Sequence, residues 1–195
     1  GLRLLRELHQ PQLNFSRLDQ LIRHEISIAH RLLRFVNSSA FAWNEPIDSI
    51  RHALVLLGEA ATRKWVALAA MPSLAMDSIP ELVRMSVYRA RFCEQVAEKT
   101  DLRPCAPECF LMGLFSLLDV MIGRPLSELL PELGLREEIC AALCGRDAAD
   151  KRFQHVFHLC RACEAADMSA IAEQSQLLGL PLDEVAKLYM EAMRW

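Results

Sequence analysis

Apolar side chains recur along this chain every three or four residues, which is the spacing of one face of an α-helix. Residues 26–36 show this spacing clearly, with Ile26, Ala29, Leu32, Leu33 and Val36 at helical intervals. Equivalent patterns predict further helices at 2–9, from 16 onward, and at 50–57, 59–75, 80–99, 108–123, 126–130, 135–144, 151–165, 168–178 and 182–194. The sequence has no convincing period-two alternation, internal repeat or low-complexity linker. The pattern therefore predicts an all-α fold, a single multi-helix domain, with a division into two helical lobes left open.

Capping and breaking residues mark several of these boundaries. Ser16, followed by Asp19, resembles an N-terminal capping signal. Gly58 suits the C-terminal end of the helix before it. Pro80 and Pro107 suit the first turns of the helices that they open, because a first-turn residue needs no partner for its N–H.

Composition agrees with a helical protein that has a sizeable core. Apolar residues make up 52% of the 195 residues, and seven glycines and nine prolines are few for a turn-rich all-β fold. The net charge is −3 and the pI is about 6.1, whereas a generic nucleic-acid surface is usually basic. A protein that binds nucleic acid is therefore not favoured.

The cysteines and the apolar runs bear on the compartment. Seven is an odd number, and a chain of this size needs no disulfide staples, so we expect reduced thiols in a cytoplasmic protein. Charged residues interrupt each apolar run well before the roughly 18 residues of a membrane span. The chain begins GLRLLRELHQ, without an initiator Met or a signal-peptide layout. We therefore expect a fragment of a longer protein, with Gly1 as a remnant of cloning.

The segment HVFHLCRAC at 155–163 carries ligand-like spacings. On a helix, however, His155 and His158 share one side while Cys160 and Cys163 share another, so four ligands cannot converge on one ion. We expect no metal here. The sequence also lacks a G-x-S-x-G motif and a phosphate-binding glycine loop. No catalytic residue and no cofactor are predicted from motifs.

Basic and aromatic residues gather at Arg63, Lys64 and Trp65, with Arg51 and Trp43 upstream. Interleaved arginine and tryptophan side chains can anchor a protein partner or stack on bases. The pattern also fits an aromatic side chain packed in the core beside a solvated charged face, and that alternative stays open. The candidate partner surface consists of Trp43, Arg51, Arg63 and Trp65.

FLMGLFSLLD, at 110–119, predicts a buried helix because apolar residues cover most of its circumference. What remains is a narrow stripe of Glu108, Met112, Ser116 and Asp119, which we expect to face solvent or a water-filled groove. A buried lone carboxylate would need partners. Three arginines near in sequence offer them: Arg84, Arg89 and Arg91.

An ordered set of motifs carries a family resemblance. These are LDQLIRHEISIAHRLL at 18–33, LLRFVNSSAF at 32–41, IDSIRHALVLLGEAATRKWVAL at 47–68, RARFCE at 89–94 and FLMGLFSLLD at 110–119. Together they resemble the HDOD domains of bacterial signalling proteins, relatives of the HD phosphohydrolases. The resemblance spans 2–130, leaving 131–195 as a C-terminal helical extension. It implies an HD-like helical bundle with Asn37, Ser38 and Gly58 as structural signature residues, although Glu25-Ile26 stands where the family often has Asp-Pro.

The same resemblance bears on catalysis. Active HD enzymes carry a metal-binding His-Asp pair after a Gly-Leu-Leu lead-in on a central helix, and the metal activates water. Here Gly113-Leu114-Phe115 matches the lead-in, so Ser116 and Leu117 occupy the two ligand positions. Serine is a poor ligand for such metals and leucine is none. No His lies between 53 and 154 to supply the ligand expected from the helix at 80–99.

The resemblance is strongest to the form of HDOD domain that follows an EAL domain, the type associated with cyclic-di-GMP hydrolysis. It implies a non-catalytic regulatory domain that contacts signalling proteins or its own EAL domain. The resemblance is also compatible with an oligomer. The alternative is a nucleotide-binding or hydrolytic domain with a non-standard pocket around Asp119. A nucleic-acid-binding domain is the third hypothesis.

Overall fold

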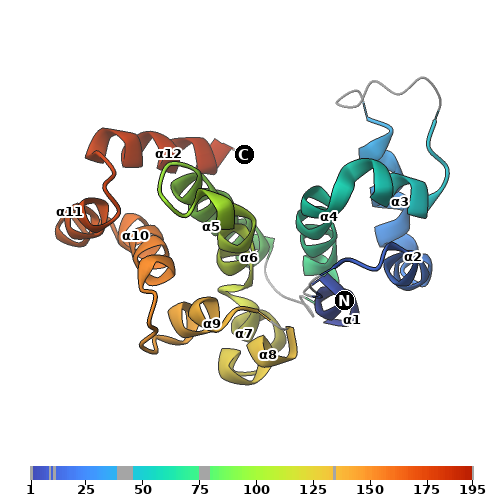
Figure 1. Cartoon of the computed structure of the whole chain (residues 1–195), viewed down its shortest axis with the longest axis horizontal. Coiled ribbons are helices and arrows are strands. Elements are labelled where there is room, and N and C mark those ends of the chain that lie inside the picture. Colours follow the sequence, from blue (N-terminus) through green and yellow to red (C-terminus); the bar gives the residue numbers. More distant parts are fainter. Residues whose placement is uncertain are drawn as a thin grey trace. The chain divides into compact units, whose positions relative to one another are not determined.

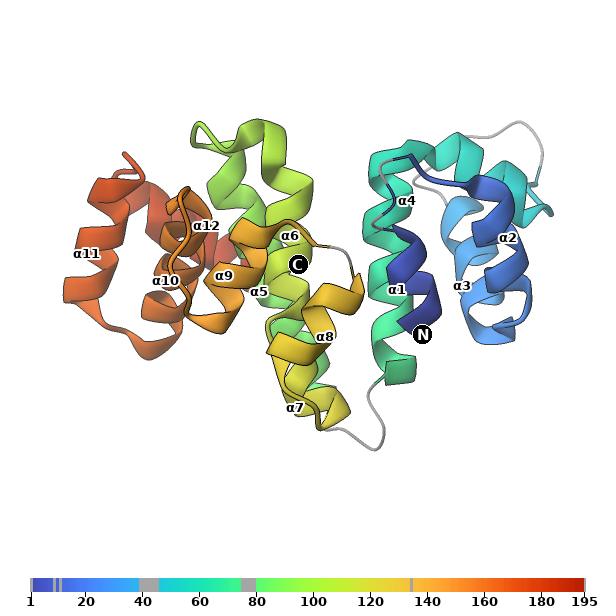
Figure 2. The same cartoon turned by 60° about the horizontal axis from the view of Figure 1, so that its bottom comes forward.

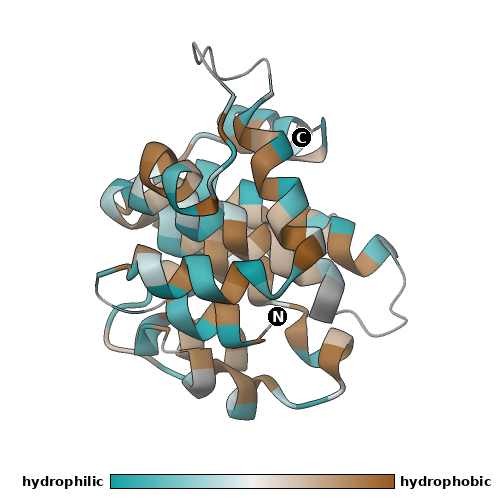
Figure 3. Cartoon of the chain, turned by 90° about the vertical axis from the view of Figure 1, so that its right-hand side faces the viewer, coloured by the Kyte–Doolittle hydropathy of each residue, from teal (hydrophilic) through white to brown (hydrophobic). Residues whose placement is uncertain are grey.

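In the computed structural model, the described residues are 2–8, 10, 12–38, 46–74, 80–133 and 135–194. Within these ranges the chain forms α-helices and one 3₁₀ turn, and it contains no strand (Figures 1 and 2). Hydrophilic and hydrophobic residues alternate in short blocks along the helices, as amphipathic packing requires (Figure 3). The all-α prediction is confirmed, and the helices divide into two compact units.

Unit 1 comprises residues 1–76 and 132–134. Its helices are α1 (Leu2–Leu8), α2 (Phe15–Arg23), α3 (Ile26–Val36) and α4 (Ile50–Leu74). The first three pack against α4 and bury Leu5, Leu18, Ile28 and Leu54. The predicted cap at Ser16 is wrong: Asn14 precedes the helix, and its side chain accepts a hydrogen bond from the Arg17 N–H at 3.0 Å.

Helix α4 is interrupted at Gly58, where the sequence predicts a boundary. Gly58 has φ +74° and ψ 173°, a conformation that side-chain-bearing residues rarely adopt. The buried Thr62 hydroxyl, which lies beyond the interruption, donates to the carbonyl of Leu54 before it at 3.1 Å. A side-chain hydrogen bond thus connects the two halves of α4 across the kink.

Unit 2 comprises residues 77–131 and 135–195. Its elements are α5 (Pro80–Glu98), η1 (Arg103–Cys105), α6 (Ala106–Phe115), α7 (Leu118–Ile122), α8 (Leu126–Leu133) up to residue 131, α9 (Glu137–Cys144), α10 (Arg152–Ala165), α11 (Met168–Leu177) and α12 (Leu182–Arg194). Helices α10 and α12 pack on α5, and α9 packs on α6. The helices of the predicted C-terminal extension therefore share a core with α5 and α6.

Helices α5 and α6 lie very close together because α6 carries Gly113 at the contact. A Cβ atom built at Gly113 would lie 2.4 Å from the Arg89 carbonyl oxygen and 2.5 Å from the Ala90 nitrogen. Real Cβ atoms do not approach backbone so closely, so glycine is required by the α5–α6 distance rather than by its own dihedral angles.

The continuous helix predicted at 108–123 is wrong. Helix α6 ends at Phe115, and Leu117, with φ −123° and ψ 14°, separates it from α7. The Ser116 hydroxyl donates to the Gly113 carbonyl at 2.7 Å, which occupies the acceptor that the next helical N–H would use. The predicted polar stripe is therefore broken as well, since Met112 and Ser116 are buried and Asp119 belongs to α7.

Candidate functional site

The core of unit 2 contains a buried ionic cluster centred on Arg89 of α5. Arg89 is only 2% exposed. Its guanidinium binds Glu164 of α10 through two contacts, Nε to Oε1 at 2.7 Å and Nη2 to Oε2 at 2.9 Å. Two parallel bonds of this kind are the strongest geometry for an arginine and a carboxylate. The pair ties the middle of α5 to the end of α10.

Ser116 completes this cluster from the end of α6. Its hydroxyl accepts a hydrogen bond from Arg89 Nη1 at 3.1 Å while it donates to the Gly113 carbonyl. Leu117 is half-buried and offers no polar atom. The position that the HD resemblance assigns to the metal-binding histidine is therefore beside a fixed guanidinium. Both hydrogen-bonding roles of the serine are already used.

Asp119 lies outside this cluster. It is half-buried in the first turn of α7, where the helix dipole favours a carboxylate, and its Oδ1 is buried without a hydrogen-bond partner among the described residues. The arginines suggested as partners are arranged otherwise: Arg89 binds Glu164, and Arg91 binds Glu94 at 3.0 Å. Arg84 has no partner among the described residues.

The segment at 155–163 lies in α10. His155 Nδ1 lies 3.0 Å from Gln174 Oε1 of α11, and Cys160 is buried. Within the described ranges, no three His, Cys, Asp or Glu side chains are placed to hold a metal ion. All seven cysteines are free thiols. Burial raises the pKa of Cys140 to about 11 and that of Cys163 to about 12, so both stay protonated at neutral pH.

Two residues of the predicted partner surface, Arg63 and Trp65, lie in α4 of unit 1. Arg63 forms an ion pair with Glu59 and donates to the Gln10 carbonyl at 2.8 Å, so it ties the α1–α2 connection to α4. Trp65 is half-buried and stacks on the ring of Phe35 in α3, with the ring centroids 6.1 Å apart. The two side chains therefore contact different elements.

The other two members of that surface are Arg51 and Trp43. Arg51 is exposed and has no partner among the described residues. Trp43 lies outside the described residues. The structure adds Phe35, which is 41% exposed. The apolar pattern of α3 marks Phe35 only weakly, because it falls between core positions, and Trp65, whose ring stacks on it, is distant in the sequence.

Asn37 forms a reciprocal pair of hydrogen bonds. Its Nδ2 donates to the Ile47 carbonyl, and its Oδ1 accepts from the Ile47 N–H, both at 2.7 Å. The side chain thus pairs with backbone ten residues away, as a neighbouring strand would. Ser38 contributes a backbone hydrogen bond from its N–H to the Phe35 carbonyl at 3.1 Å. The asparagine of the family signature therefore closes the connection between α3 and α4.

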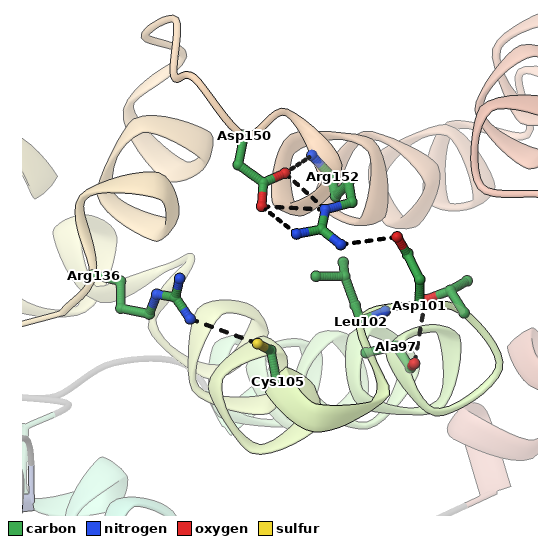
Figure 4. Close-up of polar contacts among 8 residues, drawn as sticks. Ala97, Asp101, Leu102, Cys105, Arg136, Asp150 and Arg152 are labelled. Atoms are coloured by element: carbon green, nitrogen blue, oxygen red, sulfur yellow. Dashed lines mark hydrogen bonds and ion pairs between the residues drawn. The ribbon is translucent and has the colours of Figure 1, made fainter.

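A second polar cluster joins the start of α10 to the end of α5 (Figure 4). Arg152 binds Asp150 at 2.7 Å and Asp101 at 2.8 Å, and hydrogen bonding from Arg152 lowers the pKa of Asp150. Beside them, Arg136 donates to Cys105 Sγ at 3.6 Å. The charges satisfy one another, so this cluster is a structural connection rather than a reactive site.

None of the described helices combines the length and apolar composition needed to cross a bilayer.

Two curated proteins are similar to this chain over nearly its whole length. The chain is 31% identical over 195 residues to the cyclic di-GMP phosphodiesterase CdgJ of Vibrio cholerae, covering all of this chain and 44% of that protein. It is 32% identical over 197 positions to the uncharacterized protein YuxH of Bacillus subtilis, covering 98% of this chain and 46% of that protein.

The chain thus spans less than half the length of these curated relatives. No solved structure shows a significant match. The family model of the HDOD domain matches residues 2–132. This range includes the hydrogen bonds between Asn37 and Ile47, which we call the Asn37 clasp, the kink of α4 and the turn at Ser116. The chain therefore belongs to the HDOD family.

Proposed function

We propose that this chain is a non-catalytic regulatory domain that acts by contact with protein partners, including an adjoining EAL domain, in cyclic-di-GMP signalling. The observation that carries the first part is the buried Arg89–Glu164–Ser116 cluster. A divalent cation beside Ser116 would meet the fixed charge of Arg89 and would be repelled. The nearby carboxylate is already held by two hydrogen bonds.

The signalling context is supported by the relationship to CdgJ, whose name records a cyclic di-GMP phosphodiesterase. Because this chain covers less than half of that protein, the phosphodiesterase activity is not transferred to it. Contact with a partner would shift the population of that partner's active state rather than perform chemistry. The Phe35–Trp65 pair and the exposed Arg51 provide a surface for such contact.

Catalysis is tested with the purified chain, Mn²⁺ or Mg²⁺, and two substrates, cyclic di-GMP and bis(p-nitrophenyl) phosphate. We expect no hydrolysis above the rate of a protein-free blank. Titration calorimetry with cyclic di-GMP is expected to give no binding heat. Metal-dependent hydrolysis that is lost in Ser116→Ala would refute the proposal and favour the hydrolytic alternative.

Contact is tested in the full-length protein that contains this chain. The variants Arg51→Glu and Trp65→Ala are expected to change the turnover of cyclic di-GMP or the recovery of partners in a pulldown. Arg17→Glu is the matched control, because Arg17 is exposed on α2 and its side chain has no partner among the described residues. If all three proteins behave like the wild type, the surface in unit 1 is not the contact.

A further inference from the structure

Unit 2 contains a cleft of about 590 Å³ formed by α5, the end of α10 and α12. Helices α5 and α12 lie side by side here (Figures 1 and 2). Tyr88 of α5 and Tyr189 of α12 meet edge to face between them, with the ring centroids 5.4 Å apart. The cleft therefore has a well-packed aromatic base.

Several exposed apolar side chains form the walls of the cleft. Val83 and Val87 line it, together with Met85 and Met193, which are 42% and 63% exposed. Methionine side chains are flexible and polarizable, and they are frequent at surfaces that bind other proteins. Burying these side chains against another molecule would be favourable.

Two charged residues of the lining have no partner among the described residues. Glu81 and Arg84 both line the cleft and are exposed, and neither forms a hydrogen bond or an ion pair with another described residue. They lie three residues apart and so share one side of α5. The third charged residue of the lining, Glu164, is already bound by Arg89. The cleft thus presents one available anion and one available cation.

We infer that this cleft is the interface of a two-fold symmetric homodimer. A two-fold interface requires a patch that complements itself. When the two α5 helices run antiparallel across the axis, Glu81 of each protomer faces Arg84 of its partner, and the exposed methionines fill the opposite cleft. A partner of a single charge would leave one of the two residues unmatched. This self-association goes beyond the proposed function and does not depend on it.

Sedimentation velocity of the 195-residue chain over a range of concentrations tests the dimer. The wild type is expected to self-associate reversibly. Glu81→Arg and Arg84→Glu each place like charges opposite one another twice per dimer, so each variant should dimerise about tenfold more weakly. Far-ultraviolet circular dichroism confirms that both variants are folded.

The decisive sample is an equal mixture of the two variants. One presents only arginine at the two positions and the other only glutamate, so they should pair with each other at wild-type strength or better. Mixing Glu81→Arg with Arg103→Glu is the control, because Arg103 lies beyond the opposite end of α5. Arg103→Glu should self-associate like the wild type, and its mixed dimer with Glu81→Arg should be weaker, since it keeps only one of the two Glu81–Arg84 pairs. A wild type that is monomeric at about 100 µM, or a variant mixture that stays monomeric, would overturn the inference.

Discussion

Arg89 carries a charge into the core of unit 2, where its stability depends on the carboxylate of Glu164. Glu164 is the penultimate residue of α10, and a carboxylate is unfavourable near a helix C-terminus. The bidentate contact offsets both penalties at once. Such pairs seldom add much net stability, but loss of one member leaves an uncompensated charge.

Glu164→Gln is therefore expected to reduce the free energy of unfolding by about 3 kcal/mol, because the Arg89 cation stays buried without a counter-charge. Urea unfolding followed by circular dichroism measures the change. Glu128→Gln is the control, since Glu128 pairs with Arg124 at the surface at 3.5 Å and should cost less than about 0.5 kcal/mol. Equal effects of the two substitutions would show that the buried pair carries no special weight.

Asn37 supplies both a donor and an acceptor to Ile47, whereas a carboxylate at this position can only accept. In Asn37→Asp, a carboxylate oxygen would face the Ile47 carbonyl, and the expected loss of stability is about 2 kcal/mol. Ser38→Ala should change stability by less than about 0.5 kcal/mol, because the hydrogen bond of Ser38 uses its backbone. Thermal unfolding of the two variants distinguishes them. If Asn37→Asp unfolds at the same temperature as the wild type, the hydrogen bonds between Asn37 and Ile47 do not contribute to stability.

At the scale of elements, apolar periodicity and glycine or proline positions predicted most of the helices. The bounds of α3 agree with the predicted 26–36, and the α4 kink falls at the predicted Gly58. The turn at Ser116 was missed because the apolar pattern continues through it. A serine that bonds back to its own helix leaves no signature in hydrophobic spacing, so the phasing of Asp119 was wrong.

Gly113→Ala tests the close approach of α5 and α6. By helix propensity alone, alanine should stabilise α6 by up to about 1 kcal/mol. The new Cβ would instead overlap the backbone at Arg89, so we expect a net loss of about 2 kcal/mol or more. Gly145→Ala is the comparison, because nothing lies within 4 Å and only the positive φ opposes it. Chemical denaturation should rank Gly113→Ala as the more harmful substitution.

At the scale of the whole chain, the least predictable features join distant segments. Arg89 and Glu164 are 75 residues apart, and no spacing rule connects them. The resemblance assigned the two metal-ligand positions to Ser116 and Leu117, but it gave no indication that Arg89 would lie beside Ser116. Three helices beyond the family match, α9, α10 and α12, pack on α5 or α6, and α10 supplies the carboxylate. The ionic core of unit 2 thus depends on a segment outside the HDOD profile.

The thiols of the buried Cys140 and the half-buried Cys163 limit the stability of unit 2 at alkaline pH. Desolvation raises the pKa of Cys140 to about 11 and that of Cys163 to about 12, from the ordinary value of 9.0. Below pH 9 both thiols are protonated in the folded and unfolded states, and their contribution is fully present. As the pH rises further, the unfolded chain releases these protons first, so the stability falls until the folded pKa values are passed.

Between about pH 9 and pH 11, the free energy of unfolding should therefore decrease with a slope of roughly two protons from these thiols. The double variant Cys140→Ala/Cys163→Ala should show a shallower decrease. Urea midpoints measured under reducing conditions at several pH values give both slopes, and the difference at neutral pH accounts for lost packing. Parallel curves for the two proteins would mean that neither thiol is desolvated in the folded chain, and the packing of α9 and α10 would have to be looser than described.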